Sequence, residues 1–209
     1  MAKALNLQEK TANLLCRVLE RGKLRVTMVE VAALAEEEGI DEEELYDALL
    51  DLEGVRAMVP VRSKTGRGLA WEHRALKVGP GEELEVPIAV YYAFEGLLWT
   101  GRWSYEYAAQ RYFEAIREVH ASSFTEALKV MVSKTSQLLV DAELIKTSII
   151  EVGLPESEAG VLISELKGGG FISPLISMSQ LKPTAKGPYY ELNPALFRGA
   201  VRSKPFTHA

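Results

Sequence analysis

An internal repeat restricts the folds open to this chain of 209 residues. Residues 26–60 align without gaps on residues 140–174, at a shift of 114 positions. The identical pairs include Val26/Val140, Gly39/Gly153, Glu42/Glu156, Glu44/Glu158, Leu52/Leu166, Gly54/Gly168 and Pro60/Pro174. Because the helix-ending glycines and the phase of the apolar residues coincide, we interpret the segments as two copies of one unit. Two unrelated pairs of helices with ordinary caps are the alternative.

The second copy shows the order of its elements most clearly. Asp141 can cap a helix that ends at Gly153, and Pro155 then opens a second helix that the glycine run from Gly168 ends. The apolar residues of this second helix share one face: Ala159, Leu162, Ile163 and Leu166. Strands are predicted over residues 171–176 and 189–192.

The first copy is predicted to contain the same elements. Thr27 and Glu30 have the spacing of a capping box, and Asp41 caps the next helix. Strands are predicted over residues 55–62 and 69–76, joined by a glycine-containing turn.

A helix, a turn, a second helix and a two-stranded wing resemble a winged helix-turn-helix domain. The broad layout is similar to tandem winged-helix subunits of the segregation-and-condensation type and of general transcription factors. The resemblance implies an α+β fold, mainly α, with two winged-helix units joined by an aromatic-rich helical connector. We expect winged-helix domains at residues 1–78 and 123–197, a linker and connector at 79–122, and a basic tail at 198–209.

The connector holds nine of the aromatic residues: Tyr91, Tyr92, Phe94, Trp99, Trp103, Tyr105, Tyr107, Tyr112 and Phe113. We interpret this cluster as the core that packs the connector onto the two units. An exposed interface for a partner or a second copy is the alternative, with Tyr91, Tyr92, Phe94, Trp99 and Trp103 as its candidates. After the connector, Ser123 and Glu126 predict a capping box that opens the next helix.

The charge on the second helix of the first copy argues against the usual winged-helix function. That helix reads DNA in many such domains, and it needs Arg, Lys, Asn or Gln to do so. Residues Asp41–Glu53 contain seven carboxylates and neither Lys nor Arg. A phosphate backbone would repel this helix.

Basic residues instead gather in the first wing and in the tail. The candidates for nucleic-acid contact are Arg62, Lys64, Arg67, Arg74, Arg198, Arg202 and Lys204. A solvated hairpin whose cations balance the nearby acidic helices is the alternative for the wing. A frayed end is the alternative for the tail.

Enzyme and cofactor patterns find no match. His73, His120 and His208 are scattered without metal-ligand spacing, and Cys16 lies in an apolar helical pattern typical of a packed thiol. We expect no catalytic residue, cofactor, metal or small-molecule ligand. The single cysteine fits a reducing cytoplasm, and no apolar run approaches the length of a membrane span. The few Gln and Asn residues beside 29 acidic and 24 basic ones suggest a thermophilic source.

Two functions are therefore expected. The first is a non-enzymatic adaptor or subunit of a transcription or chromosome-maintenance assembly, with a protein partner or a second copy bound to it. The second is a DNA-binding regulator that contacts phosphates through the first wing and the tail.

Overall fold

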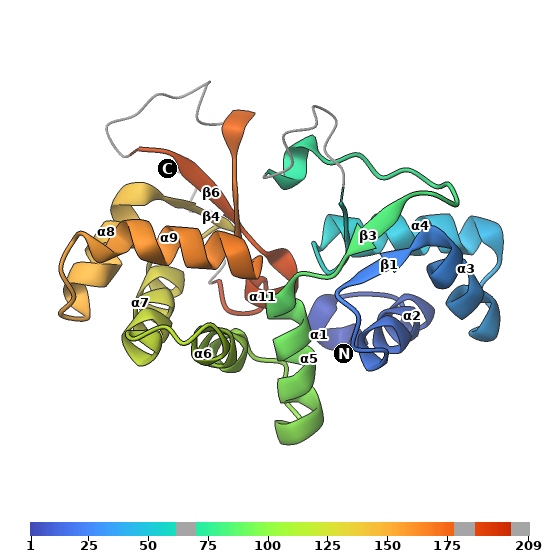
Figure 1. Cartoon of the computed structure of the whole chain (residues 1–209), viewed down its shortest axis with the longest axis horizontal. Helices are drawn as coiled ribbons and strands as arrows, with labels where there is room; N and C mark the ends of the chain where they lie inside the picture. The colour runs from blue at the N-terminus through green and yellow to red at the C-terminus, as the bar shows by residue number, and fades with distance from the viewer. Residues whose placement is uncertain (62–69, 178–186, 202–209) are drawn as a thin grey trace, which may run out of the picture.

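The computed structural model describes residues 1–61, 70–177 and 187–201, and it shows one order of elements twice along the chain (Figure 1). The N-terminal half comprises α1 (Ala2–Leu5), α2 (Glu9–Glu20), β1 (Arg25–Thr27), α3 (Met28–Glu37), α4 (Glu42–Gly54), β2 (Val59–Pro60), the 3-10 helix η1 (Trp71–His73) and β3 (Glu83–Glu85). The connector comprises α5 (Ile88–Thr100) and α6 (Tyr105–Ala115). The C-terminal half comprises α7 (Ala121–Lys134), β4 (Leu139–Asp141), α8 (Ala142–Glu151), α9 (Glu158–Gly169), β5 (Ile172–Pro174), β6 (Tyr189–Leu192) and α11 (Pro194–Phe197). The fold class is α+β and mainly α, as predicted.

Each half contains a three-stranded antiparallel sheet whose last strand lies in the middle. The orders are β1-β3-β2 and β4-β6-β5. Leu84 pairs with Val26 and Pro60, and Tyr190 pairs with Val140 and Pro174. The outer strands of the two sheets thus keep the spacing of the sequence repeat.

Side-chain caps set the starts of α3, α4 and α8, as predicted. At α3, the Glu30 N–H donates to Thr27 Oγ1 (3.2 Å) and the Thr27 N–H donates to Glu30 Oε2 (2.8 Å). A second capping box joins Asp41 and Glu44 at α4. Asp141 accepts the Leu144 N–H (2.8 Å) at α8. These bonds satisfy amide groups that a helix start leaves without partners.

The strand predicted over residues 69–76 is wrong. Within its described part, residues 70–76, η1 takes the place of an extended strand, and the returning strand is β3, in the segment expected to be a linker. The backbone N–H of the buried Trp71 donates a hydrogen bond to Ser173 Oγ (2.9 Å), which belongs to the other half. A contact between residues so distant in the chain cannot be seen in a local pattern.

Two predicted helix starts are also wrong. The capping box of Ser123 and Glu126 does not form, because α7 already begins at Ala121 after His120. Pro155 lies in the turn before α9, and the Glu158 N–H donates to its carbonyl (3.0 Å).

The connector lies between the halves (Figure 1). It shares one continuous apolar core with both. Phe113 of α6 stacks on Phe171 at the end of α9, with ring centroids 6.4 Å apart, and it meets Phe124 of α7 edge-on. The interpretation of the cluster as core is confirmed for Phe94, Tyr112 and Phe113, which are buried.

Polar contacts also join the halves. Glu72 accepts hydrogen bonds from the Ile176 N–H (2.6 Å), the Ser177 N–H (3.0 Å) and the Ser177 hydroxyl (2.6 Å). Arg56 forms ion pairs with Glu53 and with Glu191 of β6. The two halves are therefore held in one arrangement.

Candidate functional site

A groove of about 560 Å³ opens on the N-terminal half between α3, the start of α4 and residues 78–80. Buried Met28, Ile40 and Leu45 lie at its base, since they also belong to the core. Val29 and Val78 line it and are 58% and 51% exposed. Exposed aliphatic side chains beside a hollow are typical of a surface that binds another molecule.

The polar side chains that line this groove are acidic. Glu36, Asp41 and Glu42 line it, and none of its described lining residues is basic. The same charge continues along the outer face of α4, where Asp47 and Asp51 are exposed. Tyr46 and Leu50, which lie one helical turn apart on α4, are also exposed. We call this groove, with its acidic side chains, the acidic groove.

At the corresponding place in the C-terminal half, ion pairs join α8 to the turn before α9. Lys146, which the repeat aligns with Ala32, lies 2.7 Å from Glu156 and 3.6 Å from Glu143. The hydrogen bond to Glu156 and the charges of both glutamates raise the pKa of Lys146. Ala32 is exposed and too short to reach Glu42, the counterpart of Glu156, so the groove of the N-terminal half stays open.

The aromatic residues named as interface candidates lie in different environments. Phe94 is buried, and Tyr91 and Tyr92 are half-buried with their rings edge-on at 5.9 Å. The Trp103 Nε1–H donates to the Ala195 carbonyl (2.8 Å). Trp99 is 79% exposed at the end of α5 and is the one candidate of the five with a broadly open surface.

The basic candidates are not brought together in the part of the chain that the structure describes. Arg62, Lys64, Arg67, Arg202 and Lys204 lie outside the described residues. Arg198 is exposed after α11.

Arg74 follows η1 instead of a strand of the wing. Its side chain is half-buried, and its Nη1 donates to the Pro60 carbonyl (3.2 Å).

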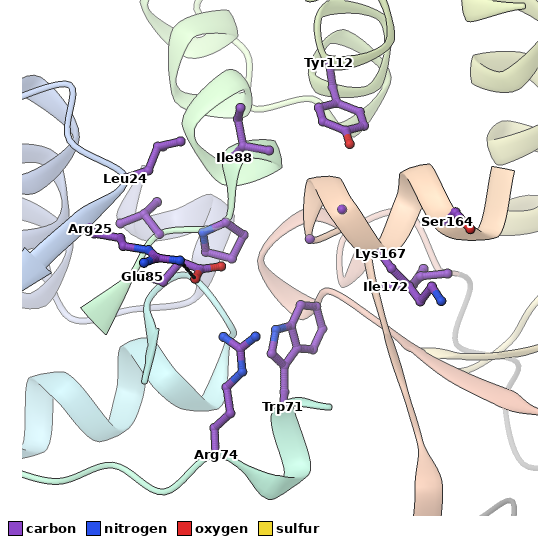
Figure 2. A pocket seen from close by; sticks show the side chains of 14 residues that line it. Leu24, Arg25, Trp71, Arg74, Glu85, Ile88, Tyr112, Ser164, Lys167 and Ile172 are labelled. Carbon is purple, nitrogen blue, oxygen red and sulfur yellow. Dashed lines mark ion pairs between the residues drawn. The ribbon is translucent and has the colours of Figure 1, made fainter. Parts of the chain in front are cut away.

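Arg74 lines a second cavity, also of about 560 Å³, which we call the central cleft (Figure 2). The N-terminal half contributes Arg25, Trp71, Arg74 and Glu85, and α9 contributes Ser164 and Lys167. Sequence reasoning missed both cavities, because each is lined by segments that are separate in the chain.

Among the described residues, no group of three or more His, Cys, Asp or Glu side chains could hold a metal ion. No helix in the same ranges is both long and apolar enough to cross a membrane.

A protein-family model matches most of the chain. The chain belongs to the protein family whose model matches residues 4–201, which covers both halves and the connector. No curated protein and no solved structure matches the chain.

Proposed function

We propose that this chain is a non-enzymatic tandem winged-helix protein that serves as a protein-interaction subunit of a nucleic-acid-related assembly. The order helix, strand, helix, helix, strand, strand in both halves supports the winged-helix assignment. The acidic groove is the observation that carries the proposed function. The half-buried thiol of Cys16, whose pKa burial raises, supports a location in the reducing cytoplasm.

The charge of the groove determines the kind of partner. Glu36, Asp41 and Glu42 would repel a phosphate backbone and attract cations. The apolar base and walls favour a bulky aliphatic or aromatic side chain. The occupant is therefore a segment of a partner protein with an apolar anchor residue between lysines or arginines.

The repeat supplies a variant that should close the groove without disturbing the fold. Ala32→Lys copies the arrangement of Lys146, so the new ammonium group should pair with Glu42 and cover the apolar base. Ala33→Lys is the matched control, because Ala33 is exposed on the same helix and does not line the groove.

The experiment selects peptides from a displayed random library on the native protein and measures their affinity by calorimetry. We expect the selected sequences to hold an apolar residue flanked by basic ones. Ala32→Lys should weaken their binding at least ~tenfold, and Ala33→Lys by no more than about twofold. Peptides without basic residues, or equal binding to Ala32→Lys, would refute the proposal. Self-association that Ala32→Lys abolishes would identify a second copy as the occupant instead.

A DNA-binding regulator is the alternative, favoured by the basic residues of the first wing and tail. It predicts binding of random-sequence duplex DNA that falls steeply with salt and is lost in the Lys64→Glu, Arg67→Glu double variant. Fluorescence anisotropy at low and moderate salt measures this. Retained affinity in the double variant would remove the alternative.

A further inference from the structure

The central cleft is a second site of different chemistry from the acidic groove. It lies between β1, β3 and η1 of the N-terminal half and α9 of the C-terminal half (Figure 2). Its volume of about 560 Å³ is in the range of pockets that hold small organic molecules. Such pockets occur preferentially where two folded units meet.

Positive charge predominates among the described residues of the cleft. Arg25, Arg74 and Lys167 line it, against one carboxylate, Glu85. Glu85 lies opposite Arg25 on the neighbouring strand and 3.8 Å from its guanidinium group. The other two cations come from different elements, because Arg74 follows η1 and Lys167 lies on α9 (Figure 2).

Burial strengthens the field of Arg74. Its guanidinium group is half-buried, and desolvation lowers its pKa whereas the Glu85 carboxylate raises it. An arginine keeps its charge in proteins. A charge held partly out of water interacts more strongly with an opposite charge than an exposed one does. Tyr112, at another wall, adds no negative charge, because burial and the Glu165 carboxylate raise the pKa of its phenol to about 12.

Most of the remaining lining, apart from Ser164, is apolar. Leu24, Ile88 and Ile172 contribute aliphatic side chains, and the Trp71 ring borders the cleft beside Arg74 (Figure 2). An inorganic anion alone would leave this surface uncovered. A ligand with both an anionic group and an apolar ring or chain would cover both kinds of lining.

We propose that the central cleft binds a small organic anion, a phosphate or a carboxylate with an apolar body. Its anionic group lies between Arg74 and Lys167, and its apolar part packs against Ile88 and Ile172. Because these residues belong to both halves and the connector, the bound molecule strengthens their contact. The inference does not depend on the proposed function of the acidic groove.

Calorimetry with phenyl phosphate tests this inference on the full chain. Inorganic phosphate and benzyl alcohol each supply one half of the ligand. We expect phenyl phosphate to bind at least ~tenfold more tightly than either of them. Benzoate then distinguishes a phosphate site from a general carboxylate site, and binding of either anion supports the inference.

Two variants locate the binding. Lys167→Glu reverses the charge of an exposed residue, and it should weaken the binding of phenyl phosphate at least ~tenfold. Lys77→Glu is the control, because Lys77 is an exposed lysine that does not line the cleft, and its effect should stay within about twofold. Arg74→Gln should abolish binding, with circular dichroism to confirm that the variant folds.

Three results would overturn the inference. They are equal binding of benzyl alcohol and phenyl phosphate, unchanged affinity in Lys167→Glu, and an absence of binding at millimolar phenyl phosphate. Single-stranded DNA that binds while all three small anions fail would assign the cleft to nucleic acid instead.

Discussion

Asn193 shows how one buried polar residue can join several parts of this molecule. Its side-chain amide donates to the carbonyls of Arg56 (3.2 Å) and Gly170 (2.9 Å), and its Oδ1 accepts the Ala195 N–H (3.0 Å). The residue is fully buried, so water cannot replace any of these partners. The sequence shows only an Asn at the end of a predicted strand, because the carbonyls that it reaches are distant in the chain.

Replacement of Asn193 should therefore be costly. We expect Asn193→Ala to lower the free energy of unfolding by about 3 kcal/mol, because two buried carbonyls lose their donors. Asn193→Asp should cost more at pH 7, since a carboxylate would face those carbonyls, and less at low pH, where it is protonated. Urea unfolding measures both, with the exposed Asn13→Ala as control. A change below ~1 kcal/mol in Asn193→Ala would contradict this view of the junction.

Glu30 predicts a pH dependence. Hydrogen bonds from Lys23 and Thr27 lower its pKa from 4.5 to about 2. A lowered carboxyl pKa means that the ionised group stabilises the folded state above about pH 4.5 and that this contribution is lost as the pH falls through about 2. The difference in unfolding free energy between the native protein and Glu30→Gln should be constant near neutral pH and shrink over that window.

Measurements at high salt distinguish the contribution of Lys23 to the lowered pKa of Glu30 from that of Thr27. At about 1 M salt the exposed pair with Lys23 is largely screened, whereas the hydrogen bonds to Thr27 remain. A difference that is equal at pH 7 and pH 2 would contradict the role of the ionised carboxylate.

At the scale of elements, local sequence patterns predicted the caps and strands that depend on residues close together in the chain. The capping box at Thr27, the N-cap at Asp41 and the strand Tyr189–Leu192 form as expected. β3 was missed because Glu83–Glu85 has an ordinary linker composition and becomes a strand by pairing with β1 and β2. The two cavities were missed for the same reason, since their walls meet only in the folded chain.

Substitution of the glycine after α9 tests how closely this helix end packs on the start of α5. Gly170 has φ +73°, and a Cβ at this position would lie 2.6 Å from Pro87 Cβ, just before α5. Gly39 has a similar φ of +67°, but a Cβ there would meet nothing within 4 Å. Gly170→Ala should therefore cost about 2–3 kcal/mol and Gly39→Ala only about 1 kcal/mol, the conformational part alone. Equal losses in thermal or urea unfolding would show that α9 and Pro87 are not in firm contact.

At the scale of the whole molecule, the two halves differ in charge at a position that lines the acidic groove. Ala32 lines this open groove, whereas its counterpart Lys146 forms ion pairs with Glu143 and Glu156 in the C-terminal half. We infer that the N-terminal half carries the partner surface and that the C-terminal half, through α9, completes the central cleft.

Amide chemical-shift mapping with a selected basic peptide tests directly whether the acidic groove receives the partner. The peptide is titrated into ¹⁵N-labelled protein, and the shifted amides are placed on the structure. The proposal predicts the largest shifts at Val29, Ala32 and Val78, and their loss in Ala32→Lys. Shifts centred on α9 or on the central cleft, with the groove amides unchanged, would contradict it.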